Sequence, residues 1–261
     1  MMFNFLIYLS IFVFGLIFGS FLNCVIYRLH SGESFLKGRS FCPNCQHILS
    51  WPDLIPVFSF LILKGKCRYC HKPISLQYPL VELATGTVFL LIFWNLEFGI
   101  WDLLFRLLIS CFLIIIFVYD LKHYIIPDQV IYPAIVIAFL YNIYQFTIDN
   151  QQLTINNFLS AFGAAAFFLT LVLISHEKWL GWGDVKLAFL MGLFLGWPKI
   201  LLALFLAFFI GAIIGIELII LGKKTLKSEI PFGPFLVSGT FLALFFGQKI
   251  LDWYLNLFLL K

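Results

Sequence analysis

Charged residues are scarce in this chain of 261 residues. Asp, Glu, Lys and Arg make up 11% of it, whereas hydrophobic residues make up 62% and aromatic residues 19%. A soluble domain has about 25% charged residues, so this chain cannot cover a surface that faces water. The composition excludes a soluble enzyme, a fibrous protein and a disordered tail, and it predicts a polytopic protein of a lipid bilayer. Because the basic residues are scattered over loops, we expect no nucleic-acid partner.

The first apolar run, residues 2–27, lacks the basic start and the small-residue cleavage site of a signal peptide. It carries Gly15, Gly19 and Ser20 at a spacing that suits helix packing, so we expect it to be a retained span. Seven further apolar runs follow, at about residues 80–94, 103–119, 125–146, 158–175, 185–197, 200–221 and 235–251. The predicted fold is therefore all-α, with about eight transmembrane helices.

One polar segment interrupts these runs. Residues 28–78 hold seven of the 17 Lys and Arg residues and four of the six Cys. An apolar stretch inside it, residues 54–63, is too short to cross a bilayer, which takes about 20 residues, and we interpret it as the core of a loop domain or as an interfacial piece. The predicted domains are the first span at 1–28, a loop domain at 29–78 and a seven-helix membrane domain at 79–261.

Lys and Arg are rare on one predicted side of the membrane. If the polar segment lies in the cytoplasm, 13 of the 17 basic residues fall on the cytoplasmic side and four fall outside, namely Arg106, Lys199, Lys249 and Lys261. The positive-inside rule then predicts a multi-pass protein with the Cys-rich loop in the cytoplasm and both termini outside.

The polar segment contains two CxxC pairs separated by 21 residues, Cys42 with Cys45 and Cys67 with Cys70. Each pair can turn two thiolates toward one ion, and two pairs complete the tetrahedral shell that Zn²⁺ favours. The alternatives are two disulfides, which a cytoplasmic location disfavours, and a redox CxxC, which would not need two copies. We expect a structural zinc ion that folds the loop domain.

Two aspartates lie at predicted membrane boundaries. Asp120 ends one span, and Asp184 opens another directly after Gly181 and Gly183. Two carboxyl groups in a partly desolvated site share a proton, which is how an aspartic protease activates water. Each Asp could instead be a plain helix-end residue, with Asp184 as an N-cap. Asp128, at the start of the next span, is typical of a helix cap. We expect it to lie close enough to influence Asp120.

Several motifs occur in one order along the chain. They are residues 19–29 (GSFLNCVIYRL), the CxxC pairs with Ile48, Trp51 and Ile55–Pro56, residues 65–67 (GKC), residues 78–83 (YPLVEL), Asp120 through Ile126–Pro127–Asp128, and residues 183–187 (GDVKL), which include Lys186. In this order they resemble the type IV prepilin peptidases from Gly15 to about Pro234. One departure is Asp53–Leu54, where that family more often has Asn before Ile-Pro.

The resemblance implies an enzyme of the cytoplasmic (inner) membrane. It would remove the leader of type IV prepilins and of related pseudopilins of type II secretion or competence, cutting after a glycine on the cytoplasmic side. It also implies N-methylation of the new terminus with S-adenosylmethionine. Asp120 and Asp184 would be the catalytic pair, and the four cysteines the metal site. The methylation site is less clear, because the chain lacks a Gly-rich nucleotide loop. Its candidates are Gly65, Lys66 and Glu82, which could equally be a turn, a positive-inside charge and an acid of a first helical turn.

Three other functions stay open at this stage. An intramembrane GxGD aspartic protease of the presenilin type would share the two Asp motifs, but that type also has a Pro-Ala-Leu motif, which this sequence lacks. A proton-coupled transporter could use the two aspartates as a relay, although transport sites favour the bilayer midplane. An inactive scaffold for pilus assembly is the third. Neither the particular substrates nor the oligomeric state follow from the sequence.

Overall fold

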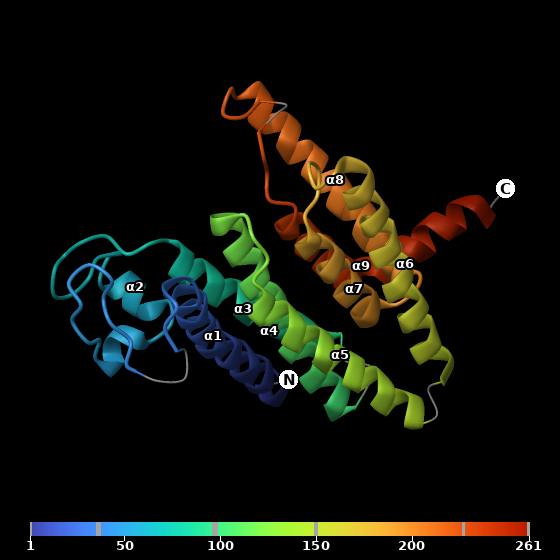
Figure 1. Ribbon diagram of the computed structural model, residues 1–261. Coiled ribbons are helices and arrows are strands. Elements are labelled where there is room, and N and C mark those ends of the chain that lie inside the picture. Colours follow the sequence, from blue (N-terminus) through green and yellow to red (C-terminus); the bar gives the residue numbers. More distant parts are fainter. Residues whose placement is uncertain (1, 35–37, 96–98, 149–150, 226–227, 260–261) are drawn as a thin grey trace. The chain divides into compact units, whose positions relative to one another are not determined.

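The computed structural model describes residues 2–34, 38–95, 99–148, 151–225 and 228–259; Lys37, Lys227 and Lys261 of the charge count above lie outside them. Over the described residues the chain is helical, with two isolated β-bridges in the Cys-rich loop. The elements in Figure 1 are α1 (Met2–Ser31), the 3₁₀ helix η1 (Trp51–Leu54), α2 (Phe58–Ile62), α3 (Gln77–Trp94), α4 (Ile100–His123), α5 (Asp128–Thr147), α6 (Gln151–Ser175), α7 (Trp182–Leu195), α8 (Lys199–Ile220) and α9 (Gly233–Leu259).

Seven helices of the described part are long and apolar enough to cross a membrane: α1, α3, α4, α5, α6, α8 and α9. The all-α membrane fold expected from the composition is thereby confirmed, since each of the eight predicted apolar runs lies largely in a helix. The run at 185–197 is the exception in length. It corresponds to α7, whose 14 residues measure about 21 Å, against a hydrocarbon core of about 30 Å.

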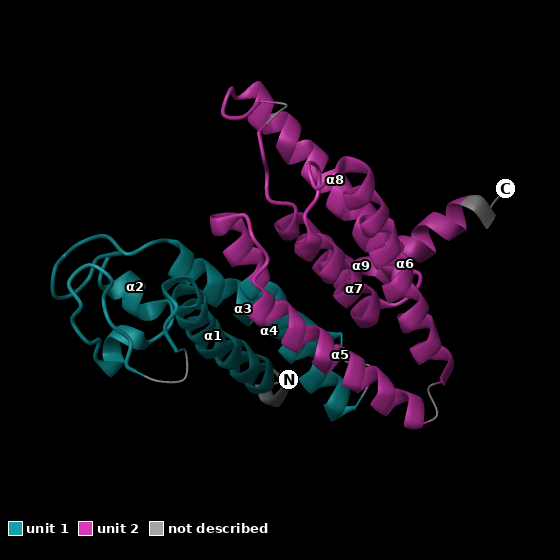
Figure 2. Cartoon of the chain, viewed as in Figure 1, with its two compact units in different colours: residues 1–115 teal, residues 116–261 magenta. Residues whose placement is uncertain are grey.

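The chain folds into two compact units, residues 1–115 and 116–261, which Figure 2 colours separately. Their boundary falls inside α4. The domain limits proposed from the sequence follow polarity instead, and they stay predictions of where the chain enters the membrane. Helix α1 continues past the first of these limits to Ser31, and α3 begins slightly before the second, at Gln77.

In the first unit, α1 packs against α3 through glycines. A Cβ atom added to Gly15 would lie 2.6 Å from the Cα of Gly86, and one added to Gly19 would lie 2.6 Å from the Cα of Glu82. The two backbones therefore touch, as small residues at this spacing allow in membrane helices. Beyond these contacts the Asn23 amide donates to the Tyr78 carbonyl oxygen at 3.0 Å. This packing fixes the start of α3, and with it the loop between the two helices.

In the second unit, α7 packs mainly against α6 and also against α5 and α9, while α8 packs against α9. The rings of Phe168, Phe208 and Phe232 form an aromatic cluster, with centroids 4.9–6.1 Å apart. Such rings supply much of the buried apolar area of a core. Phe232 immediately precedes α9, so this cluster holds the first residue of α9 in place for the contacts described next.

Candidate active site and metal centre

The two aspartates predicted to be catalytic both lie in the second unit and are buried. Asp120, in the last turn of α4, is 4% exposed, and Asp184, in the first turn of α7, is 8% exposed. The Ile126 side chain faces both Gly233, which donates to Asp120, and Gly183, which precedes Asp184, so the two carboxyl groups lie in one region of this unit. The structure therefore brings together two residues that lie 64 positions apart in the sequence, at two helix ends.

Each carboxyl group also accepts one backbone hydrogen bond. The amide of Gly233 donates to Oδ2 of Asp120 at 3.0 Å, and the amide of Gly181 donates to Oδ2 of Asp184 at 3.0 Å. Gly181 is the N-cap of α7, so Asp184 caps its own helix from the third position. The N-cap is therefore Gly181 and not Asp184, which was the alternative considered above, and Asp184 instead accepts the Gly181 amide from the N3 position, which holds its carboxylate in place.

Gly233 is a site residue that sequence reasoning missed. A Cβ atom there would lie 2.5 Å from Oδ2 of Asp120, and one on Gly183 would lie 2.9 Å from the Cβ of Ile126. Both positions therefore require glycine for close approach. By contrast, only the Gly183 amide comes within 4 Å of a Cβ placed on Gly181, which leaves open space beside the start of α7. The Pro-x-Gly-Pro sequence around Gly233 is the only local signal for its role.

The supporting residues Asp128 and Lys186 form an ion pair. Asp128 is the first residue of α5, and its Oδ1 lies 2.5 Å from the Nζ of Lys186. The same ammonium group lies 4.7 Å from the centroid of the Tyr132 ring. Lys186 follows Asp184 by two residues, so this contact joins the N-terminal part of α7 to the first turn of α5. Because the Asp128 side chain is largely exposed, the pair contributes little to stability.

The four loop cysteines converge as the spacing predicts. Their Sγ atoms all lie within 4.8 Å of one another, and those of Cys42 and Cys70 are 3.9 Å apart. The Zn–S distance of about 2.3 Å in tetrahedral zinc sites corresponds to sulfur atoms about 3.8 Å apart. All four cysteines are free thiols. The donor set and its spacing therefore fit a zinc ion held by Cys42, Cys45, Cys67 and Cys70.

The two CxxC turns have the same local structure. In the first, the amide of Cys42 donates to the His47 carbonyl oxygen at 2.9 Å, and in the second the amide of Cys67 donates to the Lys72 carbonyl oxygen at 2.9 Å. The residue after each pair has a positive φ, 58° at Gln46 and 57° at His71. Such turns direct backbone N–H groups at the thiols, the arrangement that stabilises thiolates.

The thiols also differ in acidity, which bears on metal binding. Burial would raise the pKa of Cys42, but the amides of Cys45 and Asn44 and the neighbouring thiols lower it to about 7. For Cys70, the Lys72 amide lowers the pKa, but desolvation and the neighbouring thiols outweigh it and raise the pKa to about 11. One thiolate thus forms readily, whereas a full set of four needs a cation to offset the crowded negative charge.

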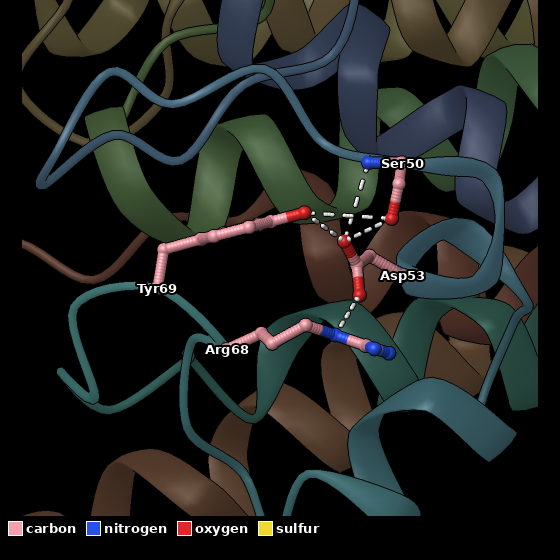
Figure 3. Close-up of polar contacts among 4 residues, drawn as sticks. All are labelled: Ser50, Asp53, Arg68 and Tyr69. Atoms are coloured by element: carbon pink, nitrogen blue, oxygen red, sulfur yellow. Dashed lines mark hydrogen bonds and ion pairs between the residues drawn. The ribbon is translucent and has the colours of Figure 1, made fainter.

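Asp53 links the two CxxC turns, as Figure 3 shows. Its Oδ2 accepts hydrogen bonds from the Ser50 amide (3.2 Å), the Ser50 hydroxyl (2.7 Å) and the Tyr69 hydroxyl (3.1 Å). Its Oδ1 lies 2.7 Å from the Nε of Arg68, and its side chain is 3% exposed. Arg68 and Tyr69 stand between Cys67 and Cys70, so one buried carboxylate ties the second turn to the segment that follows the first. The sequence had marked this residue only as a departure from the family pattern.

Two of the three methylation candidates, Glu82 and Gly65, contact the two ends of α2. Oε2 of Glu82, a buried side chain of α3, accepts a hydrogen bond from the Val57 amide at 2.7 Å, just before α2. Gly65 follows α2 with a φ of +69°, and a Cβ atom there would lie 3.1 Å from the Phe60 ring. Lys66 comes next and is exposed. The three therefore share one framework with Cys67.

Two family profiles match the chain in succession. Residues 13–96 match the profile described as "Bacterial Peptidase A24 N-terminal domain", and residues 107–216 match the profile described as "Type IV leader peptidase family". The first match contains the four cysteines and the methylation candidates, and the second contains both aspartates. No solved structure gave a significant match to the chain.

Relatives that align with nearly the whole chain are described as "Prepilin leader peptidase/N-methyltransferase". The relative from Aeromonas hydrophila is 32% identical over 273 residues, which are 95% of this chain and 94% of the relative. The relative from Bacillus subtilis (strain 168) is 33% identical over 253 residues, which are 95% of this chain and 97% of the relative. A relative from Legionella pneumophila is 30% identical over 95% of this chain and 94% of its own length.

Proposed function

The chain belongs to the type IV leader peptidase family, and from this membership we propose that it is a membrane-bound aspartic endopeptidase. Its substrates are type IV prepilins and pseudopilins, which it cuts after a glycine on the cytoplasmic side. It then methylates the new N-terminus with S-adenosylmethionine. The names of the relatives include both activities. This supports an enzyme with two activities over a protease without methylation and over a transporter.

One observation carries the proposal for cleavage: two buried carboxyl groups lie in one region of the second unit, at helix ends, with one backbone donor each. A pair of this kind holds one proton between its members. The ionised carboxyl takes a proton from a water molecule, and the protonated one donates to the carbonyl oxygen of the scissile peptide. The tetrahedral intermediate then collapses, releasing the leader and a new amine. Asp120 and Asp184 perform these steps in our proposal.

The methyl transfer is assigned to the first unit. S-adenosylmethionine, when bound, supplies an electrophilic methyl group to the deprotonated amine of the cut substrate. Glu82 is a buried acidic side chain whose Oε2 accepts a hydrogen bond from the Val57 amide, and Gly65 and Lys66 directly precede Cys67 of the metal-binding turn. The zinc ion is structural in this proposal and fixes the fold of residues 41–74.

The charge distribution supports the orientation. The described basic residues near Asp120 and Asp184, among them Lys122, Lys178 and Lys186, lie on the same predicted side as the Cys-rich loop. Because prepilin leaders enter from the cytoplasm, that side is the one on which a leader could reach both sites. We therefore place the protein in the cytoplasmic membrane with these groups on its inner face.

Substitution of either aspartate tests the proposal. We expect Asp120→Asn and Asp184→Asn each to reduce the cleavage rate of a model prepilin by about 10⁴-fold, measured by mass spectrometry with the purified full chain in detergent. Wild-type enzyme should remove the leader, and it should add one methyl group when S-adenosylmethionine is present.

Asp252→Asn is the matched control, because Asp252 is exposed on α9 and accepts a hydrogen bond from Gln248 of the same helix. A pre-cut peptide with a free amine separates the two activities, and both Asn variants should still methylate it. If either Asn variant cuts at the rate of the control, the assignment of the aspartates is wrong.

A further inference from the structure

The short helix α2 turns an apolar face outward. Phe58, Leu61 and Ile62 stand at positions i, i+3 and i+4, which share one side of a helix, and they are 60%, 63% and 74% exposed. The opposite side packs inward, since the Phe60 ring lies against Gly65 at the start of the second CxxC turn. A helix on a water-facing domain has the reverse arrangement, with polar residues outside. The solvent around α2 is therefore expected to be apolar.

The structure also fixes the depth of α2 along the membrane helix α3. The amide of Val57, the residue before α2, is hydrogen-bonded to Glu82 at 2.7 Å. Glu82 lies five residues after Gln77, the first residue of α3, which is about 7.5 Å along the helix. Leu80 and Leu83, on either side of Glu82 in the sequence, are 61% and 40% exposed. At this level α3 already presents large apolar side chains to its surroundings, and α2 begins at the same level.

The residues flanking α2 suit the boundary between lipid headgroups and acyl chains. Trp51, in the turn before α2, is exposed, and indole rings favour that boundary. Lys64, two residues after α2, is exposed, as is Arg68. Such cationic side chains are attracted to anionic phospholipid headgroups. An apolar helical face with an adjacent Trp and basic residues is typical of a segment that lies in the interface.

We propose that the α2 face formed by Phe58, Leu61 and Ile62 docks into the phospholipid bilayer surface, between the headgroups and the acyl chains, on the side where α3 begins. Its occupant is phospholipid rather than a second copy of the chain or the second unit. The consequence is positional: Gly65 follows α2 closely and contacts Phe60, so membrane contact of α2 fixes the start of the second CxxC turn near the bilayer surface. This inference is independent of the proposed catalytic activities.

Site-specific photocrosslinking in a bilayer tests the proposal. The full chain is placed in nanodiscs of phosphatidylethanolamine and phosphatidylglycerol, with p-benzoylphenylalanine replacing Leu61 or, in a second variant, Ile62. After irradiation, mass spectrometry measures the fraction of the labelled peptide that has gained the mass of one phospholipid. Leu80→p-benzoylphenylalanine provides the lipid-facing reference at the same depth, and Asn44→p-benzoylphenylalanine provides an exposed polar control in the first CxxC turn.

We expect phospholipid adducts at positions 61 and 62 at a yield similar to that at position 80 and several-fold above that at position 44. Phe58→p-benzoylphenylalanine gives a third measurement on the same face if either variant is not recovered as a monodisperse protein. Adducts at the level of position 44 would show that α2 faces water. Crosslinks from 61 or 62 to peptides of residues 116–261, or to a second copy of the chain, would show that protein covers the face. Either result overturns the proposal.

Discussion

At the scale of single residues, Asp53 is the polar centre of the loop domain. Its carboxylate bonds Ser50, after the first CxxC turn, and both Arg68 and Tyr69 inside the second, and the Tyr69 hydroxyl also bonds the Ser50 hydroxyl directly at 3.4 Å. Burial would raise its pKa, but the hydrogen bonds from Ser50 and Tyr69 and the charge of Arg68 hold the pKa below its usual range. The ionised form is therefore the one that stabilises the loop.

Asp53→Asn should loosen both CxxC turns. The change keeps the shape of the side chain but removes the negative charge that pairs with Arg68. It also places an amide N–H donor among the donors of Ser50 and Tyr69, so we expect the loop to lose about 1.5–3 kcal/mol of stability. Amide hydrogen exchange at Cys42 and Cys67, whose N–H groups close the two turns, should become about tenfold faster or more at pH 7. Exchange in the two proteins is compared at the same pH, so intrinsic exchange rates cancel.

The difference between wild type and Asp53→Asn should depend on pH with a definite sign. Because the folded-state pKa of Asp53 is depressed, its contribution is complete above the unfolded value of about 3.9 and is lost as the pH falls through the folded value. The gap in exchange should therefore close on acidification below about pH 4. Glu33→Gln, an exposed change in the same unit, should leave exchange unaltered. An exchange rate in Asp53→Asn equal to wild type at pH 7 would contradict the role of Asp53.

The sequence could identify residues whose chemistry carries a local pattern and could not identify those defined by contact. The spacing of the four cysteines identifies them in the sequence, and the two glycines before Asp184 identify that residue. Gly233 lies 113 residues from Asp120, and its role is a close approach that only the folded chain creates. The hydrogen bond from the Val57 amide to the Glu82 side chain likewise joins residues 25 positions apart. Such contacts have no signature in hydropathy, because they depend on where helices meet.

At the scale of helices, hydropathy located the spans but not their ends. Side chains that face lipid are apolar, so hydropathy detects each membrane-spanning run in the sequence. The end of a helix, however, depends on where its backbone hydrogen bonds end. The span predicted at 103–119 is α4, Ile100–His123, which continues through a polar last turn that includes Asp120 and Lys122. The run at 185–197 is α7, which begins three residues earlier, at Trp182, because Asp184 caps Gly181.

Helix α7 is short, so its last carbonyl groups need partners inside the membrane. Asn142 of α5 supplies one: its Nδ2 donates to the Leu193 carbonyl oxygen at 3.1 Å and to the Ala138 carbonyl oxygen at 2.8 Å. Its Oδ1 accepts from Nδ2 of Asn157 on α6 at 2.8 Å. This buried amide therefore joins three helices at the end of α7 opposite Asp184, and it sets where α7 lies.

Asn142→Leu should destabilise the second unit. The change leaves the Leu193 carbonyl and the Asn157 amide without their partner, at a cost of about 1–3 kcal/mol for each buried group. Each kcal/mol lowers Tm by about 2–4 °C for a protein of this size. Thermal unfolding in one detergent measures the shift, and cleavage of a model prepilin should slow because α7 carries Asp184.

Asn95→Leu is the control for this substitution. Asn95 is exposed at the end of α3, and its side-chain amide donates to the Leu91 carbonyl oxygen of the same helix. Its Tm should stay close to that of wild type. A variant Asn142→Leu that melts with wild type would show that the amide network does not hold α7, and the account of the short helix would then be wrong.

At the scale of the whole molecule, chemistry divides between the two units. The match to the A24 N-terminal domain, residues 13–96, lies inside the unit 1–115 with the four cysteines, Gly65, Lys66 and Glu82. Both aspartates and their amide donors, Gly181 and Gly233, lie in the unit 116–261. A change that damages one unit's site should therefore reduce one proposed activity more than the other.

Loss of one metal ligand tests this division. Cys45→Ser removes an exposed thiol from the cluster, so metal content, measured by elemental mass spectrometry, should fall, and the turns that hold Gly65 and Lys66 should loosen. Methylation of a pre-cut peptide should then fall more than cleavage of a prepilin, because the aspartate site has its own hydrogen bonds in the second unit. Cys24→Ser, in α1 and outside the cluster, should leave the metal content and the ratio of the two rates unchanged. Equal losses of both activities in Cys45→Ser would mean that the loop also serves cleavage, and the two sites would then have to be treated as one.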